Sequence, residues 1–171
     1  METKVTTPVI KAVIISLVLI VYSLVIQFSH QTQNKMLTVL PIIVFFGGII
    51  WSAISFANQM QGNVSYGQVF SHAFKTAAGI TVIMVIFTIV SAKLLFPESV
   101  EQGIEAARIE MEKKGMPDEQ VEQALSLTRR FFIPFAIGGA LLMYMIAGVI
   151  AGLIGAAVAK KNPESPFTNQ V

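Results

Sequence analysis

The sequence predicts an all-α integral membrane protein with four transmembrane helices and a polar helical hairpin between the third and the fourth. Composition is the first reason, because 54% of the 171 residues are hydrophobic and only 13% are charged, which is too apolar for an ordinary soluble domain. The second reason is that the apolar residues form four long runs, and about 20 such residues cross about 30 Å of hydrocarbon. Runs without alternating polarity can pair their backbone groups in lipid only as helices, which argues against a barrel.

The first two predicted spans cover residues 9–28 and 37–57. Lys11 lies one turn inside the first span, where a long side chain can bury its methylenes and lift its ammonium to the membrane surface. No small-residue cleavage site follows this run, so we expect a retained span rather than a secretory signal. Pro41 falls in the first turns of the second span, where its missing N–H costs least.

The third predicted span covers residues 76–95, and the fourth covers residues 132–158. Residues 58–75 form a mixed connection that we expect to run along the membrane surface into the third span, because its apolar residues recur at helical spacing. Lys93, near the end of the third span, is placed to extend its ammonium to the membrane surface. The fourth run is long enough to span with a tilt or to project beyond the bilayer.

Small residues mark one side of the fourth span. Gly148 and Gly152 form a GxxxG motif, Ala156 extends it on the same face, and Gly155 belongs to a second small stripe beside it. Such residues let helix backbones approach closely, so this side is predicted to pack against another helix. A helix of the same bundle and a helix of a second subunit both fit, and packing within the chain is the preferred interpretation.

Four spans place both termini and residues 58–75 on one side of the membrane and the polar hairpin on the other. A raw count of Lys and Arg favours the hairpin inside, but the first span usually dominates the orientation. Lys4 and Lys11 near the start of that span outnumber Lys35 after it. We therefore expect both termini to be cytoplasmic.

Residues 97–130 are the only long polar segment, and they are predicted to form two antiparallel helices. The apolar stripe of the first helix consists of Val100, Ile104, Ala107 and Met111. Gly115 ends this helix, and Pro117 is suited to the first position of the second. The hairpin either stands upright from the bilayer or lies flat with its apolar stripe in the membrane surface.

The charges of the hairpin follow the helix dipole, with acids near the helix starts and bases near the ends. These candidate interaction residues are Glu98, Glu101, Glu105, Lys113, Lys114, Asp118, Glu119, Arg129 and Arg130. Antiparallel packing would bring each acidic end beside the other helix's basic end. Exposed ion pairs contribute only about 0 to 1 kcal/mol each, so we expect them to set register more than stability.

Chemistry is not predicted for this segment. Glu98, Glu101 and Glu105 share a helix face, as a metal or acid–base site would require, but no histidine lies between residues 97 and 130 to complete a di-metal motif. A solvated helix face is the preferred interpretation. His30 and His72 are placed on opposite sides of the membrane, both near its surface. We predict no catalytic residue, no cofactor and no metal site.

Several functional classes are disfavoured by what the chain lacks. There is no cysteine for a thiolate site or nucleophile, and a net charge of +2 with scattered bases does not suit nucleic acid. No Asp or Glu occurs in the spans, although such acids usually mark proton or cation coupling. Ser16, Tyr22 and Ser23 could line a path for a small solute, but hydrogen bonds between helices are the preferred interpretation of the polar groups in the spans.

The chain resembles a bacterial membrane family known as domain of unknown function 4199. The resemblance rests on the segment from Ser65 to Phe70 and on the stretch from Met111 to Leu125, continuing to Arg129 and Phe132. Pro117 departs from the family pattern, which has a Ser or Thr helix cap there. The resemblance implies a four-helix architecture in the bacterial inner membrane, and it carries over no catalytic residue.

The leading functional hypothesis is a non-enzymatic membrane protein whose 97–130 hairpin binds a membrane protein partner or a second copy of the chain. It follows from a charge-patterned hairpin without a catalytic constellation. The alternative is a bundle that transports or handles a small solute or a lipid, which the polar groups of the spans and the long fourth run suggest. In both cases the lipid bilayer is a partner.

Overall fold

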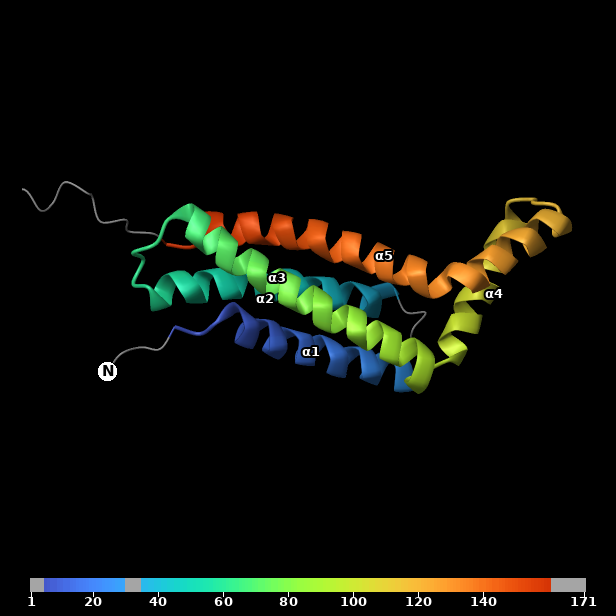
Figure 1. Cartoon of the computed structure of the whole chain (residues 1–171), viewed down its shortest axis with the longest axis horizontal. Helices are drawn as coiled ribbons and strands as arrows, with labels where there is room; N and C mark the ends of the chain where they lie inside the picture. Colours follow the sequence, from blue (N-terminus) through green and yellow to red (C-terminus); the bar gives the residue numbers. More distant parts are fainter. Residues whose placement is uncertain (1–4, 30–34, 161–171) are drawn as a thin grey trace, which may run out of the picture. The chain divides into compact units, whose positions relative to one another are not determined.

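The computed structural model describes residues 5–29 and 35–160. These residues form the helices α1 (Pro8–Phe28), α2 (Lys35–Gln59), α3 (Tyr66–Val90), α4 (Glu98–Lys113) and α5 (Asp118–Val158), with a π-helical turn η1 (Ser91–Leu95) after α3 (Figure 1). Within these two described ranges, four helical stretches are long and apolar enough to cross a membrane: Pro8–Phe28, Val39–Gln59, Tyr66–Leu95 and Asp118–Val158. The predicted all-α class with four membrane-capable helices is therefore confirmed.

The chain divides into two compact units. The first unit comprises Met1–Met84 and Met143–Val171, and thus holds α1, α2, most of α3 and the C-terminal part of α5. The second unit, Val85–Leu142, holds the end of α3, η1, α4 and the first part of α5. Each unit is described by itself below.

Contacts in the first unit set the directions of its helices. Lys11 near the start of α1 reaches Ser52 near the end of α2, and Ser52 contacts Thr76 near the start of α3. Tyr66 at the start of α3 donates a hydrogen bond to the carbonyl of Leu153 near the end of α5. The start of α1, the end of α2, the start of α3 and the end of α5 therefore lie at one end of this unit, which we call the terminal end.

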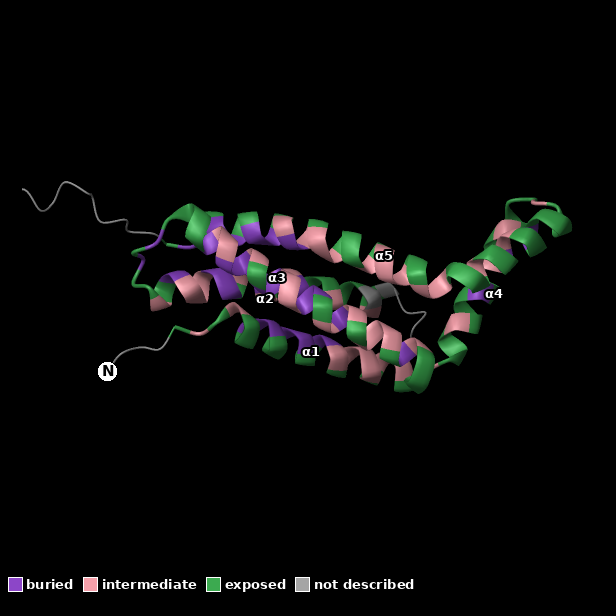
Figure 2. Cartoon of the chain, viewed as in Figure 1, coloured by how far each residue is buried: buried purple, intermediate pink, exposed green. Residues whose placement is uncertain are grey.

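Figure 2 marks the buried and the exposed stretches of each helix. In the first unit, several polar side chains are buried while many large apolar side chains are exposed. On α1, Lys11 and Ser16 are each 1% exposed. Its exposed large residues are all apolar: Val9, Ile10, Val13, Ile14, Leu17, Val18, Val21, Val25 and Phe28. Exposed apolar side chains together with buried polar ones are typical of helices in a bilayer, since polar groups in lipid face the protein interior.

The small residues of α5 pack within the chain. A methyl group added at Gly148 would lie 2.7 Å from the Cβ of Ala77 in α3, and one at Gly155 would lie 2.8 Å from the Cβ of Ala53 in α2. A methyl group added at Gly152 would lie 3.4 Å from the ring of Phe70, and Ala156 is fully buried. The small-residue side predicted from the sequence thus faces α2 and α3 of the same chain.

Helix α3 begins at Tyr66, well before the predicted start of the third span near residue 76. Its N-terminus carries a capping box, in which the Ser65 hydroxyl accepts from the Gln68 N–H and the Gln68 side chain accepts from the Ser65 N–H. Val69 and Ala73 are fully buried in the first unit. The expectation that residues 58–75 run along the membrane surface is therefore corrected from Tyr66 onward.

In the second unit, α4 packs against the first turns of α5 through an apolar core. Ile104, Val121 and Leu125 are buried at its centre. Partly buried residues surround them: Val100, Ala107, Met111, Met116 and Phe132. Gly115 joins the helices with φ +73°, a conformation that glycine adopts at little cost. Helix α5 continues without interruption past Phe131, so the predicted second hairpin helix and fourth span form one helix with Pro134 inside it.

Candidate functional site

A buried lysine lies at the terminal end of the first unit. The Lys11 side chain is 1% exposed, and its Nζ donates a hydrogen bond to the Ser52 carbonyl oxygen at 3.1 Å. The same nitrogen lies 5.9 Å from the centre of the Trp51 ring. Among the described residues, no carboxylate lies within ion-pair distance of it. The prediction that Lys11 extends to the membrane surface is wrong, because the ammonium finds a carbonyl and an aromatic ring inside the bundle.

Polar contacts continue from Lys11 into α3. The Ser52 and Thr76 hydroxyls lie 2.9 Å apart, and the Thr76 hydroxyl also donates to the His72 carbonyl at 3.0 Å. His72 is 6% exposed and stacks on Phe56, with ring centres 4.2 Å apart. The imidazole is thus covered by Phe56 inside the bundle. His30 lies outside the described residues.

Two buried polar atoms of this unit have no hydrogen-bond partner among the described residues, the Ser16 hydroxyl and the His72 Nε2. The Tyr22 hydroxyl donates to the Leu37 carbonyl at 2.7 Å. The interpretation of these groups as hydrogen bonds between helices therefore fits Tyr22, and it does not fit the Ser16 hydroxyl.

The N-terminal segment is fastened to α2 beside Lys11. The Gln59 side-chain carbonyl accepts from the Thr6 N–H at 2.7 Å. Its amide nitrogen donates to the hydroxyls of Thr6 at 2.9 Å and Ser55 at 3.2 Å. All polar groups of Gln59 are thus engaged, so this side chain holds the start of α1 against the end of α2.

Two depressions meet at Trp51 on the outside of the first unit. The polar depression has a volume of about 490 Å³ and is lined by Trp51, Ile54, Ser55, Asn58, Gln59 and Gln61. The apolar groove has a volume of about 390 Å³ and is lined by Ile14, Ile15, Val18, Val44, Gly47, Gly48 and Trp51. Trp51 belongs to both and is 49% exposed. We call the two depressions together the recess. Its polar part lies toward the terminal end of the unit, and its apolar part lies along α1 and α2.

Two glycines form the floor of the apolar groove. A methyl group at Gly47 would meet nothing within 4 Å, so the space above this residue is open. A methyl group at Gly48 would lie 3.0 Å from the Ile15 side chain, so α1 and α2 approach closely there. The groove is thus a shallow trough beside a close helix contact.

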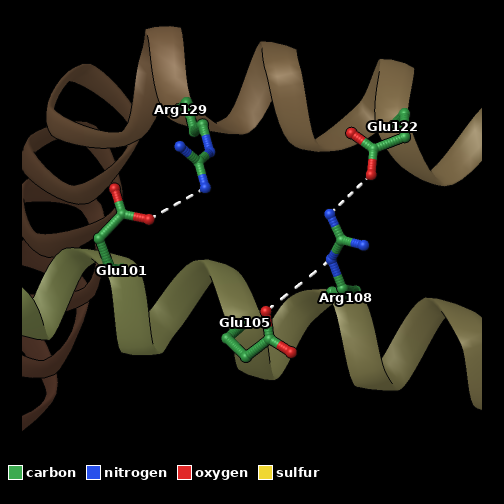
Figure 3. Close-up of polar contacts among 5 residues, drawn as sticks. All are labelled: Glu101, Glu105, Arg108, Glu122 and Arg129. Atoms are coloured by element: carbon green, nitrogen blue, oxygen red, sulfur yellow. Dashed lines mark hydrogen bonds and ion pairs between the residues drawn. The ribbon is translucent and has the colours of Figure 1, made fainter.

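The predicted hairpin charges form ion pairs between α4 and α5 (Figure 3). Arg129 lies 3.0 Å from Glu101, and Arg108 lies 2.6 Å from Glu122. Arg108 also lies 3.8 Å from Glu105. Glu101 and Glu105 thus face arginines, which accounts for these carboxylates without a metal or an acid–base role.

The remaining predicted hairpin residues take no part in the ion pairs found among the described residues. They are exposed, and they are Glu98, Lys113, Lys114, Asp118, Glu119 and Arg130. Arg130 lies over the Phe131 ring at 5.6 Å. These side chains form a charged outer surface over an apolar core that the two helices have already filled.

Sequence reasoning missed the recess at Trp51. The signal that could have indicated it is the single tryptophan of the chain, which lies near the end of an apolar run, where aromatic residues mark the membrane surface. Gly47 and Gly48, about one turn before Trp51 in the same run, indicate a stretch of helix without side chains, where another group can approach the backbone. Their relation to Ile14 and Val18 depends on how α1 packs on α2.

Comparison with known proteins gives a family but no activity. A family model described as a protein of unknown function, DUF4199, matches residues 10–161. No curated protein and no solved structure matches the chain.

Proposed function

Because the chain belongs to the DUF4199 family, whose description assigns no activity, we propose a function from the geometry at Trp51. The protein is a non-enzymatic membrane protein that holds one phospholipid in the recess between α1 and α2. The carrying observation is that a polar depression and an apolar groove share Trp51 in a unit whose outer surface is apolar.

The apolar groove suits an acyl chain. Its lining is aliphatic apart from Trp51, and its floor at Gly47 leaves open space that a flexible chain can fill. A lipid tail that lies on a smooth helix surface gains little free energy relative to one surrounded by other lipids, because lipid tails are as apolar as leucine. A trough increases the number of van der Waals contacts per methylene, and these contacts add up although each is small.

The polar depression suits a phospholipid headgroup. Asn58 and Gln61 are exposed, and their side-chain amides have no partner among the described residues. Amide N–H groups can donate to phosphate and ester oxygens, while amide oxygens can accept from headgroup hydroxyls. Trp51 lies between the two ends, as amphipathic aromatic rings do at the boundary of headgroups and acyl chains.

Replacing Gly47 by leucine is expected to fill the groove and displace the lipid. Nothing lies within 4 Å of the added Cβ, and leucine is a better helix former than glycine, so the fold is retained. We expect about tenfold less phospholipid per protein after detergent purification, because tenfold corresponds to only about 1.4 kcal/mol of lost contacts. Native mass spectrometry of the purified protein measures the retained lipid.

The matched control is Gly138→Leu, which adds the same side chain at another helical glycine with nothing within 4 Å. This variant should retain as much phospholipid as the wild type. Equal lipid retention in Gly47→Leu and Gly138→Leu would contradict the proposal, as would a wild-type protein that retains none.

A second role is favoured by the charged surface of α4 and the first turns of α5. The apolar residues of these helices pack on one another, so the outer surface offers mainly charges such as Lys113, Lys114, Asp118 and Glu119. We infer that residues 97–130 bind a protein partner or a second copy by charge complementarity. The family resemblance supports a bacterial inner membrane location, and the charges at the first span favour cytoplasmic termini. This orientation would place residues 97–130 outside the cytoplasm.

A photo-crosslinking amino acid at Lys114 is expected to capture a discrete protein partner in native membranes. Lys114 is exposed at the end of α4, and substitution there avoids Gly115, whose positive φ disfavours other residues. Mass spectrometry identifies the captured protein, and a periplasmic or dimeric product supports the proposed role and orientation. The control position is Leu153 on α5, an exposed apolar site. The same products at both positions, or capture of cytosolic proteins only, would count against the proposal.

A further inference from the structure

Lys11 presents a positive charge that the described protein does not neutralise. Its side chain is 1% exposed, it bonds one backbone carbonyl, and no carboxylate of the described residues forms an ion pair with it. An ammonium has three N–H donors and can satisfy more acceptors than this. Buried charges in proteins are usually paired, because removing an ion from water is costly.

The position of this charge relates it to the recess. Lys11 Nζ lies 5.9 Å from the centre of the Trp51 ring, and Trp51 lines both the polar depression and the apolar groove. The lysine is not itself among the lining residues, so Trp51 is the residue that connects it to both depressions. A headgroup that contacts the far face of the indole would lie on the order of 10 Å from the ammonium, at a protein surface where charges interact more strongly than in bulk water.

The lining of the polar depression supplies no charge of its own. Its polar residues are Ser55, Asn58, Gln59 and Gln61, which are all neutral. Neutral amides such as those of Asn58 and Gln61 can bind the oxygens of any phospholipid, whether its headgroup is zwitterionic or anionic. A difference between these classes must come from a charge outside the lining, and Lys11 is the charge that adjoins Trp51.

We propose that the recess selects phospholipids with an anionic headgroup, and that Lys11 acts as the selectivity residue through its electrostatic field. The proposal rests on the lipid site proposed above and adds the class of lipid. A unit charge about 10 Å away at an effective dielectric constant of about 20 corresponds to a preference on the order of tenfold. Because Lys11 is buried, salt should weaken this preference less than it weakens surface electrostatics.

Trp51 is the only tryptophan of the chain, so its fluorescence reports the recess alone. The full-length protein is reconstituted in vesicles of phosphatidylcholine with increasing brominated phosphatidylglycerol, and in the converse mixture with brominated phosphatidylcholine. Bromine quenches the indole on contact, and each protein is referenced to its own fluorescence in unbrominated lipid. The quenching curves give the affinity for phosphatidylglycerol relative to phosphatidylcholine.

The expected relative affinity is on the order of tenfold for the wild type and close to one for Lys11→Met and Lys11→Gln. Lys11→Arg should keep the preference because it keeps the charge. The matched control, Lys75→Met, removes an exposed lysine near the same end of the bundle and should also keep it. Two neutral variants guard against the misfolding of either one.

A wild-type ratio near one, or a ratio unchanged in both neutral Lys11 variants, would overturn the proposal. The proposal would also be overturned if Lys75→Met lost the preference while Lys11→Met kept it, since surface charge would then be the cause. The experiments test the lipid site and its selectivity separately. If Gly47→Leu loses retained lipid while the wild-type ratio is near one, the site stands and the role of Lys11 does not.

Discussion

Replacing Gly148 by alanine is expected to lower the stability of the first unit by about 1 to 3 kcal/mol, the usual range for overpacking a core. The added methyl group would lie 2.7 Å from the Cβ of Ala77, a distance at which the helices must separate. Since α5 contacts α2 and α3 through the same side, a shift at Gly148 also disturbs Gly155 against Ala53. Thermal unfolding in detergent, followed by circular dichroism, measures the loss.

The compensating variant removes the clash from the other helix. Gly148→Ala combined with Ala77→Gly restores the space and should recover most of the lost stability. Gly139→Ala is the matched control, because a methyl group there meets nothing within 4 Å and alanine is the better helix former. If Gly148→Ala and Gly139→Ala have the same effect, or if Ala77→Gly adds a second loss without compensation, α5 does not pack on α3 as described.

Truncation of Leu125 to alanine is expected to destabilise α4 and the first turns of α5 by about 2 to 5 kcal/mol. Leu125 is 3% exposed and is one of three residues at the centre of this apolar core. The ion pairs at Arg108 and Arg129 cannot compensate, because their partners are largely exposed and such pairs contribute little. Hydrogen exchange should show faster exchange across residues 98–128 while the first unit keeps its protection.

The control for this prediction is Leu127→Ala, two residues along the same helix. Leu127 is 57% exposed, so its truncation should change exchange in residues 98–128 very little. Equally faster hydrogen exchange in Leu125→Ala and Leu127→Ala would show that α5 does not pack on α4 through the side that carries Leu125.

The sequence predicted the helices well where the signal is local. Uncharged runs of about 20 residues have one structural solution in lipid, so all four membrane-capable helices were found. Their ends were harder to place. The start of α3 depends on the capping pair of Ser65 and Gln68, which competes with nearby turn residues such as Gly62 and Gly67. The charges of Arg129 and Arg130 suggested a boundary, but charged residues do not interrupt a helix.

The candidate site was not predictable because it depends on contacts between helices. Lys11 near a helix end extends to the membrane surface when nothing inside accepts its hydrogen bonds. Here the Ser52 carbonyl and the Trp51 ring lie beside it, and both belong to another helix, distant in sequence. His72 is buried for a similar reason, since Phe56 of α2 covers its ring. Periodicity assigns a residue to a helix face but does not say what that face meets.

The recess at Trp51 is likewise a product of packing. Gly47 and Trp51 lie one turn apart on α2, but the groove has walls only because Ile14 and Val18 of α1 stand beside them. The space above Gly47 is open, whereas the helices approach closely at Gly48, although both positions are glycines and adjacent in sequence. The polar groups of the spans and the long fourth run could therefore suggest lipid handling as an alternative, without indicating this recess.

The depth of Trp51 in the bilayer tests the central claim most directly. Phospholipids brominated on acyl carbons near the glycerol are compared with phospholipids brominated near the middle of the bilayer, using the fluorescence of this single tryptophan. A ring between the headgroup and the acyl chain of a bound lipid should be quenched most strongly by bromine near the glycerol, and Gly47→Leu should reduce that quenching. Strongest quenching from the middle of the bilayer, or none from either lipid, would contradict the account.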